Sequence, residues 1–185
     1  MKDEERQGPD PSDLELVQRG RSGDDAALGA LAKRHHAAAY RVALSFVRED
    51  DLAQDVVQDA FLKAFRALGE FRADASFRTW LLTITANEAK GALRRKGRRR
   101  ETALEDASEV RSEGGGPAHD AMMRDEASRA RRMLEQLPEK QRLSVTLRIE
   151  EGLSFKEIGE VIGSSEGAAR ANYFHGIRRL RELME

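Results

Sequence analysis

The spacing of the apolar residues is the feature that most restricts how this chain can fold. Between residues 50 and 68 they follow the three- and four-residue spacing of a helix, at Val57, Ala60, Phe61, Ala64 and Leu68. This spacing places them on one face of an α-helix. An alanine-rich stretch over residues 24–47 follows the same rule, and no segment shows the two-residue alternation of a half-buried strand. The sequence therefore predicts an all-α protein.

Breaks in this pattern divide the chain into two small helical domains. Ser12 and Glu15 form a capping-box pair that marks the start of the first helix. The stretch SEGGGP lies in an acidic segment without helical periodicity, which by its composition is a flexible linker. We expect a disordered tail over residues 1–12, a first helical domain over 13–98, an acidic linker over 99–120 and a second helical domain over 121–185.

The second domain is expected to contain a helix-turn-helix. Two helices over residues 121–152 precede a short helix capped by Ser154, a turn at Gly163 and a longer helix capped by Ser164 or Ser165. In this motif the second helix enters the major groove of DNA. The candidates for contact with bases or phosphates are Ser165, Arg170, Asn172, Tyr173, Phe174, His175, Arg178 and Arg179. A pair of helices that only packs is the structural alternative.

Charge is distributed unevenly along a chain whose formal net charge is only −1. Six cations stand close together, at Arg94, Arg95, Lys96, Arg98, Arg99 and Arg100. The helical stretch before them carries Trp80 and Asn87 on the face opposite its apolar residues. Aromatic surface beside cations is typical of proteins that bind single-stranded nucleic acid. Alternatively, Trp80 packs on a neighbouring helix and the cations form a solvated helix end.

The composition offers little support for an enzyme, a metal protein or a membrane protein. The chain has no cysteine, which excludes disulfides, thiol nucleophiles and cysteine zinc sites. His35 and His36 are adjacent, so they cannot form a metal-binding pair one helical turn apart. No run approaches the roughly 18 apolar residues of a membrane span, and the polar N-terminus is unlike a signal peptide. We predict a cytoplasmic protein without catalytic activity, metal or other cofactor.

Four segments, taken together, resemble one protein family. They read DLAQDVVQDAFLKAFRAL, FRADASFRTWLLTITANEAK, LPEKQRLSVTLRIEEGLSFKEIGEVIG and the C-terminal helix. In this order, with the linker between the second and the third, they look like a bacterial RNA polymerase sigma factor of the extracytoplasmic function (ECF) group in the sigma-70 family. The resemblance covers residues 13–185.

This resemblance implies a protein that confers promoter specificity on core RNA polymerase. Its first domain, region 2, would bind polymerase and melt the minus-10 element, and its second, region 4, would read the minus-35 element as duplex DNA. A coiled coil of the largest polymerase subunit would contact Asp51, Asp55, Gln58, Asp59 and Leu62. An extruded minus-10 base would be held by Phe71, Phe77, Trp80 and Asn87. The DNA backbone nearby would be held by Lys90, Arg94 and Arg95.

The sequence also departs from the family pattern. The family's recognition helix usually reads G-T-V-[KR]-S-R, whereas here Gly167 is followed by Ala-Ala-Arg-Ala-Asn, so one cation remains where three are usual. This predicts a divergent minus-35 sequence, read by Arg170 and His175. Gly159 stands where alanine is common, which would allow two helices to approach closely, and Gln54 replaces a usual glutamate.

The resemblance further implies regulation by a partner protein. Such factors are usually held inactive by an anti-sigma factor, here in a stress or envelope response, and the apolar polymerase-binding face is the expected contact. Linker acids would either mimic nucleic acid inside polymerase or form a passive tether; they are Glu101, Glu105, Asp106, Glu109 and Glu113. The main rival is a helix-turn-helix regulator that binds operator DNA without polymerase. A third class, an adaptor that never touches DNA, would leave the cation run without purpose.

Overall fold

Every described element of the chain is a helix. The structure is a computed structural model that describes residues 10–105, 129 and 132–184, with the backbone alone for 100–105. Its elements are α1 (Asp13–Arg21), α2 (Asp25–Val47), α3 (Asp50–Arg66), the 3₁₀ turn η1 (Leu68–Glu70), α4 (Phe77–Glu105), α6 (Glu139–Ile149), α7 (Phe155–Ile162) and α8 (Glu166–Glu182). The all-α prediction is confirmed. The helix predicted before Pro138 lies mostly outside the described residues.

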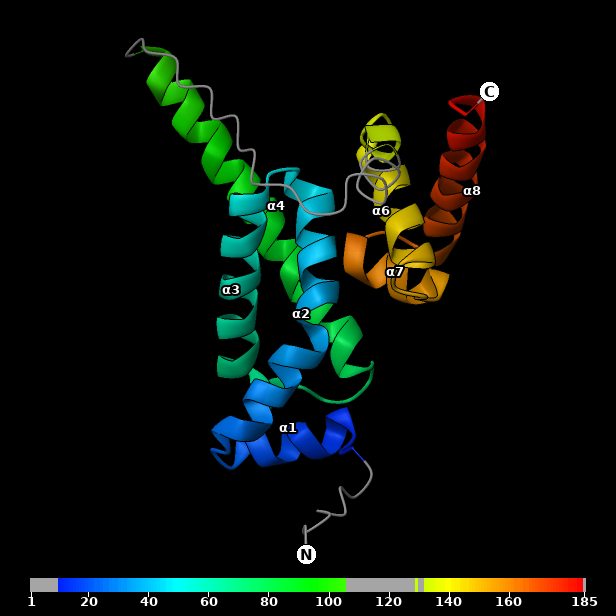
Figure 1. Cartoon of the computed structure of the whole chain (residues 1–185). Helices are drawn as coiled ribbons and strands as arrows, with labels where there is room; N and C mark the ends of the chain where they lie inside the picture. The colour runs from blue at the N-terminus through cyan, green and yellow to red at the C-terminus, as the bar shows by residue number, and fades with distance from the viewer. Residues whose placement is uncertain (1–9, 106–128, 130–131, 185) are drawn as a thin grey trace, which may run out of the picture.

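Helices α1 to α4, which we call the first lobe, form a small bundle. α2, α3 and α4 lie side by side, and α1 crosses their end (Figure 1). The positions predicted to face inward are buried, among them Val57, Phe61 and Leu68. The predicted capping box is present, because the Ser12 backbone N–H donates to Glu15 Oε2 at 2.7 Å and the Ser12 side chain accepts from the Glu15 N–H. Helical periodicity therefore located these elements and their core.

Hydrogen bonds and ion pairs around a buried histidine connect helix α1 to α2. His35 of α2 is 5% exposed, and its Nε2 lies 2.7 Å from Oδ2 of Asp13 at the start of α1. Arg34 donates to Asp13 Oδ1 at 2.6 Å and to the Pro11 carbonyl oxygen at 2.9 Å. Burial lowers the pKa of His35 and outweighs the Asp13 carboxylate, which raises it. The fold therefore favours a neutral His35 whose Nε2–H donates to Asp13.

Stability should fall as the pH drops below about 6.5, the ordinary pKa of histidine. Because the pKa of His35 is lowered in the fold, the unfolded chain takes up the proton first, and the free energy of unfolding decreases from there down to the folded-state pKa. The positive charges of Arg34 and Arg78 lower this pKa as well. One histidine contributes at most about 1.4 kcal/mol per pH unit. Urea denaturation between about pH 8 and pH 5 checks this; a His35→Gln variant with the same slope would contradict it.

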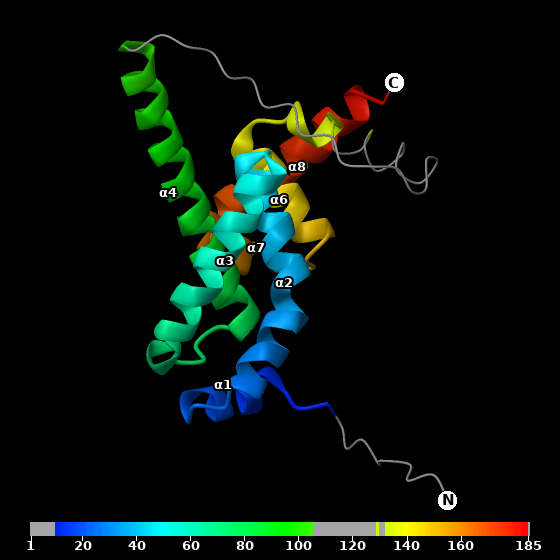
Figure 2. The same cartoon turned by 60° about the vertical axis from the view of Figure 1, so that its left-hand side comes forward.

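Helix α4 is longer than the sequence predicted. We expected the first domain to end at residue 98, but α4 continues to Glu105. Its C-terminal part extends past the ends of α2 and α3, as Figure 2 shows. A solvated helix needs no apolar periodicity, and the arginine, lysine and glutamate residues there have good helix propensity. The apolar pattern on which the boundary rested could not reveal this extension.

Helices α6, α7 and α8 form the second lobe, which contains the predicted helix-turn-helix. Ser154 caps α7 as predicted, in a capping box with Glu157, and Ser165 caps α8, its Oγ accepting from the Ala168 N–H at 3.2 Å. Gly163 ends α7 in the left-handed conformation, with φ of 71°, which glycine adopts without steric cost. α8 packs along α6 and against α7. The short helix, turn and capped second helix are thus confirmed.

Two glycines allow this close packing. A Cβ on Gly159 of α7 would lie 2.7 Å from the Ser164 carbonyl oxygen in the turn. A Cβ on Gly176 of α8 would lie 2.7 Å from Val145 Cγ2 of α6. Real Cβ atoms do not approach other atoms so closely, so a larger residue would force the backbone to move. The expectation that Gly159 lets two helices approach closely is confirmed.

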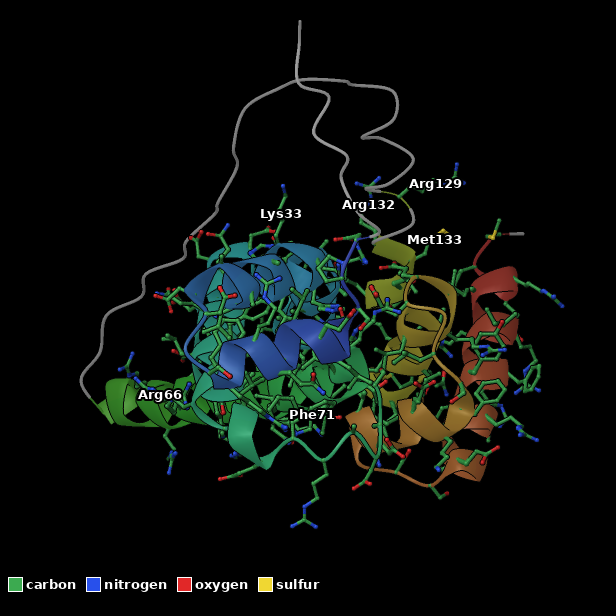
Figure 3. The ribbon with its side chains drawn as sticks, turned by 90° about the horizontal axis from the view of Figure 1, so that it is seen from below. Lys33, Arg66, Phe71, Arg129, Arg132 and Met133 are labelled. Carbon is green, nitrogen blue, oxygen red and sulfur yellow. The ribbon has the colours of Figure 1, made fainter. Side chains whose placement is uncertain are left out.

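The two lobes are in direct contact. α2 and α4 of the first lobe pack against α6 and α7 of the second, and Figure 3 shows the lobes side by side from below. The buried apolar residues of both lobes form one continuous cluster. The sequence predicted two domains but did not predict that they pack together. Most of the predicted linker, residues 106–120, lies outside the described residues.

Candidate promoter and polymerase interfaces

A pocket of about 200 Å³ lies at the loop between η1 and α4. It is lined by Glu70, Phe71, Arg72, Ala73, Asp74, Ala75 and Trp80. Ala73 has a φ of 59°, in the left-handed region that residues other than glycine seldom adopt. Such a backbone persists only where its surroundings hold it, and it is often found at functional sites. The pocket is formed by the loop in which the family resemblance places an extruded base.

The three aromatic rings predicted to hold that base pack on one another. The centroids of Phe71 and Trp80 are 5.2 Å apart, and Phe77 lies 5.9 Å from each. Phe71 and Phe77 are buried, at 5% and 1% exposure, whereas Trp80 is partly exposed. Of the three rings, Trp80 therefore presents the surface to which a base has access, and the two phenylalanines support it from the core.

Helix α1 holds this loop in place. Arg21 donates from Nε to the Leu68 carbonyl oxygen at 3.0 Å, and from a second nitrogen to the carbonyl oxygen of Phe71. Figure 3 shows Phe71 at the end of the first lobe that α1 crosses. Hydrogen bonds from a guanidinium are stronger than neutral ones, so they fix the direction in which the chain leaves η1. Sequence reasoning missed Arg21, because its partners lie 47 and 50 residues away and no local pattern marks it.

Asn87 lies on the same face of α4 as Trp80 but does not line the pocket. Two helical turns separate the two residues, which is about 10 Å along the axis. Asn87 is exposed, and Ile84 between them is partly buried. The structure thus brings Phe71 and Trp80 together and leaves Asn87 apart, at a separation that suits a neighbouring nucleotide better than the same base.

The three cations predicted to hold the minus-10 backbone fall into two groups. Lys90 faces the second lobe, where its Nζ donates to the Ile162 carbonyl oxygen at 3.2 Å. Burial lowers the pKa of Lys90. Arg94 and Arg95 are exposed on the following turn of α4. In this arrangement Arg94 and Arg95 are accessible to a DNA backbone, whereas Lys90 is occupied.

The residues predicted to bind polymerase form the outer face of α3. The exposed members of this face are Asp51, Asp55, Gln58, Asp59 and Leu62. Leu62 is 47% exposed, a large apolar side chain among acids. A hollow of about 430 Å³ beside it includes Arg66, which lies on the side of the first lobe away from the second (Figure 3). A larger hollow of about 740 Å³ between α2 and α3 includes Tyr40 and Phe61. Contact between the lobes leaves the outer face of α3 uncovered.

The exposed side of α8 carries an aromatic ring between two arginines. Arg170, Phe174 and Arg178 are exposed and stand four positions apart, on one face of the helix. Arg170 forms an ion pair with Glu166 at 2.8 Å and lies over the ring of Phe155, 5.3 Å from its centroid. Phe174 is 60% exposed. The face therefore has an apolar centre flanked by cations.

The other residues predicted to contact the minus-35 element differ in accessibility. Asn172 and Tyr173 are half-buried, whereas His175 and Arg179 are exposed. The side chain of Ser165 is engaged as the helix cap. Among these residues, His175 and Arg179 are the ones with exposed side chains, and Nδ1 of His175 lies 3.2 Å from a guanidinium nitrogen of Arg178.

A buried carboxylate joins the two lobes. The side chain of Glu151, which follows α6, has no exposed surface. It accepts hydrogen bonds from Arg41 of α2, at 2.5 Å, and from Arg78 of α4, which also donates to the Glu151 carbonyl oxygen at 2.6 Å. Nearby, Nε of Arg142 on α6 donates to the Ser45 carbonyl oxygen of α2 at 2.8 Å. We call the group of Glu151, Arg41 and Arg78 the clasp. Sequence reasoning missed it, since its members lie 110 and 73 residues apart.

The described residues contain neither a cluster of metal ligands nor a membrane-spanning helix. Within residues 10–105, 129 and 132–184, no group of three or more histidine, aspartate or glutamate side chains is placed to hold a metal ion. No helix in that part of the chain is long and apolar enough to cross a bilayer. His35, considered above as a metal ligand, hydrogen-bonds to Asp13 instead.

Both lobes match known sequence families. Residues 31–99 match Sigma-70 region 2, and residues 127–180 match Sigma-70, region 4. The chain is 38% identical over 183 residues to the RNA polymerase sigma-H factor of Pseudomonas aeruginosa, covering 94% of this chain and 92% of that one. It is 36% identical over 182 residues to the ECF RNA polymerase sigma-E factor of Escherichia coli K12, covering 94% and 93%.

Solved structures agree with these matches. CnrH in complex with the cytosolic domain of CnrY is similar at a TM-score of 0.69 and 28% identity, over 93% of this chain and 96% of that one. The sigma factor RpoE of Bartonella quintana, in complex with the anti-sigma factor NepR, is similar at a TM-score of 0.68 and 25% identity, over 84% and 95%. The chain therefore belongs to the ECF group of the bacterial sigma-70 family, as an RNA polymerase sigma factor that directs promoter-specific transcription initiation.

Proposed function

We propose a division of labour among three surfaces: the pocket at Trp80 captures a base of the melted minus-10 element, the outer face of α3 binds core polymerase, and the exposed side of α8 reads the minus-35 duplex. The observation that carries this proposal is the pocket itself, formed by a strained loop beside a partly exposed tryptophan. A site of this kind suits an extruded base better than an intact duplex.

The minus-10 role follows from the energetics of strand opening. Extruding a base costs a few kcal/mol, and stacking on an aromatic ring returns about 1–3 kcal/mol. Trp80 can provide that stacking because Phe71 and Phe77 fix its ring. Asn87, two turns along, can donate or accept hydrogen bonds with a neighbouring base. Arg94 and Arg95 can hold the phosphates that follow.

The polymerase-binding role of α3 rests on its surface chemistry. Leu62 provides an apolar contact at the C-terminal end of the face, and Asp51, Asp55, Gln58 and Asp59 provide polar contacts along it. A helix of a partner protein that meets such a face can bury the leucine and pair its own cations with the acids. The face points away from the second lobe, so polymerase has access to it.

The minus-35 role of α8 rests on its alternation of cation and ring. Because Arg170 is held by Glu166 and the Phe155 ring, its guanidinium is oriented before DNA arrives. Phe174 lies at the centre of the face, where apolar contact with a thymine methyl group is the favourable interaction in a major groove. Arg178 and Arg179 follow and are placed to meet phosphates.

Phe174→Ala should weaken initiation by about fivefold or more at promoters with thymine in the minus-35 element, since one base contact contributes about 1 kcal/mol. Transcription by the reconstituted holoenzyme on templates with thymine or uracil in that element measures the effect. Uracil lacks only the methyl group, so it should reduce wild-type activity and leave the variant unchanged. Met184→Ala, at an exposed apolar residue beyond the end of α8, is the matched control. Equal sensitivity of both proteins to uracil would refute this role of Phe174.

The proposal also covers the protein's regulatory partner, its location in the cell and its lack of catalytic activity. A sigma factor that matches this chain over 84% of its length is bound by an anti-sigma factor, which supports an anti-sigma factor as a partner here too. The chain then acts in the cytoplasm, where core polymerase is, and has no catalytic activity of its own. If a pull-down from resting cells recovers no inhibitory partner, the proposal of an anti-sigma factor is contradicted. If the purified chain alone catalyses a reaction, the proposal that it has no catalytic activity is contradicted.

The deciding experiment adds the purified chain to bacterial core polymerase and fragmented genomic DNA, followed by sequencing of transcript starts. Discrete starts that require the chain, and that share upstream sequences, are the expected result. Starts that do not depend on the chain, together with tight unaided binding to duplex DNA, would favour the helix-turn-helix regulator. Salt-insensitive behaviour without DNA binding would favour the adaptor, since contacts with phosphates weaken as salt rises.

A further inference from the structure

The contact between the lobes occupies cations on α4, the helix to which the proposed function assigns the minus-10 strand. Lys90, which the family resemblance assigns to the minus-10 backbone, donates its Nζ to a carbonyl oxygen of the second lobe. Arg78, two positions before Trp80, is bonded to both the side chain and the backbone of Glu151. Acceptors of the second lobe thus occupy two cations of α4, the helix that carries Trp80 and Asn87.

The clasp is specific to the closed arrangement of the lobes. Glu151 lies fully buried between guanidinium groups from two different helices. A buried carboxylate is tolerated only when it is paired and hydrogen-bonded, so losing one partner leaves an uncompensated charge. Thr79 adds a hydrogen bond to Glu157 at 2.9 Å across the same contact. When the lobes separate, water can solvate every member of this group.

The closed arrangement cannot span a promoter. The minus-10 and minus-35 elements are, by their names, roughly 25 base pairs apart, which is about 85 Å of duplex at 3.4 Å per base pair. The recognition helix α8 has 17 residues, and is about 26 Å long. The second lobe meanwhile touches α2 and α4 directly. The lobes must therefore separate before both elements can be bound at once.

We propose that the clasp of Glu151 with Arg41 and Arg78 is an autoinhibitory contact, which keeps the lobes together until polymerase separates them. The inference rests on the proposed role of the first lobe in binding the minus-10 strand. Polymerase can bind first, because α3 lies on the side of the first lobe away from the second (Figure 1). Opening exposes the apolar cluster that the lobes share, so the free chain remains closed and binds promoter DNA weakly.

Two dyes measure the arrangement of the lobes directly. The chain has no cysteine, so Lys33→Cys and Glu182→Cys introduce one labelling site on an exposed position of each lobe. Single-molecule energy transfer on the free chain should show a mainly closed population. Glu151→Gln removes the charge and keeps the shape, and it should raise the ratio of open to closed molecules at least about tenfold. Affinity for a mixed-sequence single-stranded DNA oligonucleotide should rise several-fold with it.

A neighbouring carboxylate provides the matched control. Glu150 lies 3.6 Å from Arg41 but its side chain is 38% exposed, so Glu150→Gln should change neither readout. Arg41→Gln breaks the clasp from the first lobe on α2, away from the DNA-binding helix α4, and it carries the test should Glu151→Gln fail to fold. A free wild-type chain without a closed population would overturn the inference, as would clasp variants that stay closed. Opening without a gain in DNA affinity would overturn the inhibitory role.

Failure of the proposed function would look different. In that case the clasp variants would still open in the energy-transfer measurement, but the holoenzyme would give no transcript starts that depend on the chain. Opening and transcription are thus measured separately: the energy-transfer result tests the clasp, and the transcription result tests the proposed function.

Discussion

Trp80→Ala is expected to reduce initiation from duplex promoters by about ten- to a hundredfold, because stacking of a base on an aromatic ring contributes about 1–3 kcal/mol. The ring is partly exposed at the loop pocket, with Phe71 and Phe77 behind it. Polymerase binding should stay unchanged, since the outer face of α3 is a separate surface. Transcription by the reconstituted holoenzyme on duplex and on pre-melted templates measures the effect, and the pre-melted template should restore most of the activity.

The control for this experiment is Ile84→Ala, one turn further along the same face of α4. Ile84 is also partly buried, so it reports loss of packing without loss of an aromatic ring. Asn87→Ala should behave like Trp80→Ala but more weakly, impairing promoter opening more than polymerase binding. A Trp80→Ala holoenzyme that fails equally on both templates, or that no longer assembles, would rule out base capture as its role.

Gly159→Ala is expected to lower the free energy of unfolding by about 1–3 kcal/mol, the usual cost of overpacking. The added Cβ would lie 2.7 Å from the Ser164 carbonyl oxygen, and backbone atoms in the turn cannot move aside as a side chain can. Urea denaturation of the full chain, followed by circular dichroism, measures the change. Binding to minus-35 duplex in the holoenzyme should fall as well, because the turn sets the angle between α7 and α8.

Gly29→Ala is the matched control, because Gly29 is exposed within α2 and has open space around its Cα. Removing glycine from a helix interior without a clash should stabilise the chain by about 0.5–1 kcal/mol. The two substitutions are chemically identical and should have opposite signs. If both substitutions stabilise the chain, the turn relaxes by a few tenths of an ångström, and the close approach at Gly159 does not contribute to the free energy of unfolding.

Features that depend on residues close together in the sequence were predicted better than features that depend on long-range contacts. The capping boxes at Ser12 and Ser154 are read from residues three positions apart, and both are present. Gly163 ends α7 as expected, for the similarly local reason that glycine adopts positive φ. Such signals survive in a single sequence because the interacting groups are near neighbours along the chain.

At the candidate site, the sequence did not predict which side chains are accessible to DNA. Phe71 and Phe77 were predicted to hold a base, but a sequence cannot tell an aromatic residue that stacks on DNA from one that fills the core. The structure buries both and leaves Trp80 accessible. Lys90 was predicted to contact DNA and is occupied by the second lobe. Each of these outcomes depends on what the rest of the fold places beside the residue.

The sequence by itself determined the all-α class, the positions of most described helices, the helix-turn-helix and the family, because each is encoded in spacings of a few residues or in ordered motifs. Only the tertiary structure decided that the lobes pack together through Glu151, whose partners Arg41 and Arg78 lie 110 and 73 residues away. It also decided that Arg21 holds the loop at the base pocket. Ion pairs and hydrogen bonds of this kind form between residues that share no local pattern, so only the packing of distant helices can bring them together.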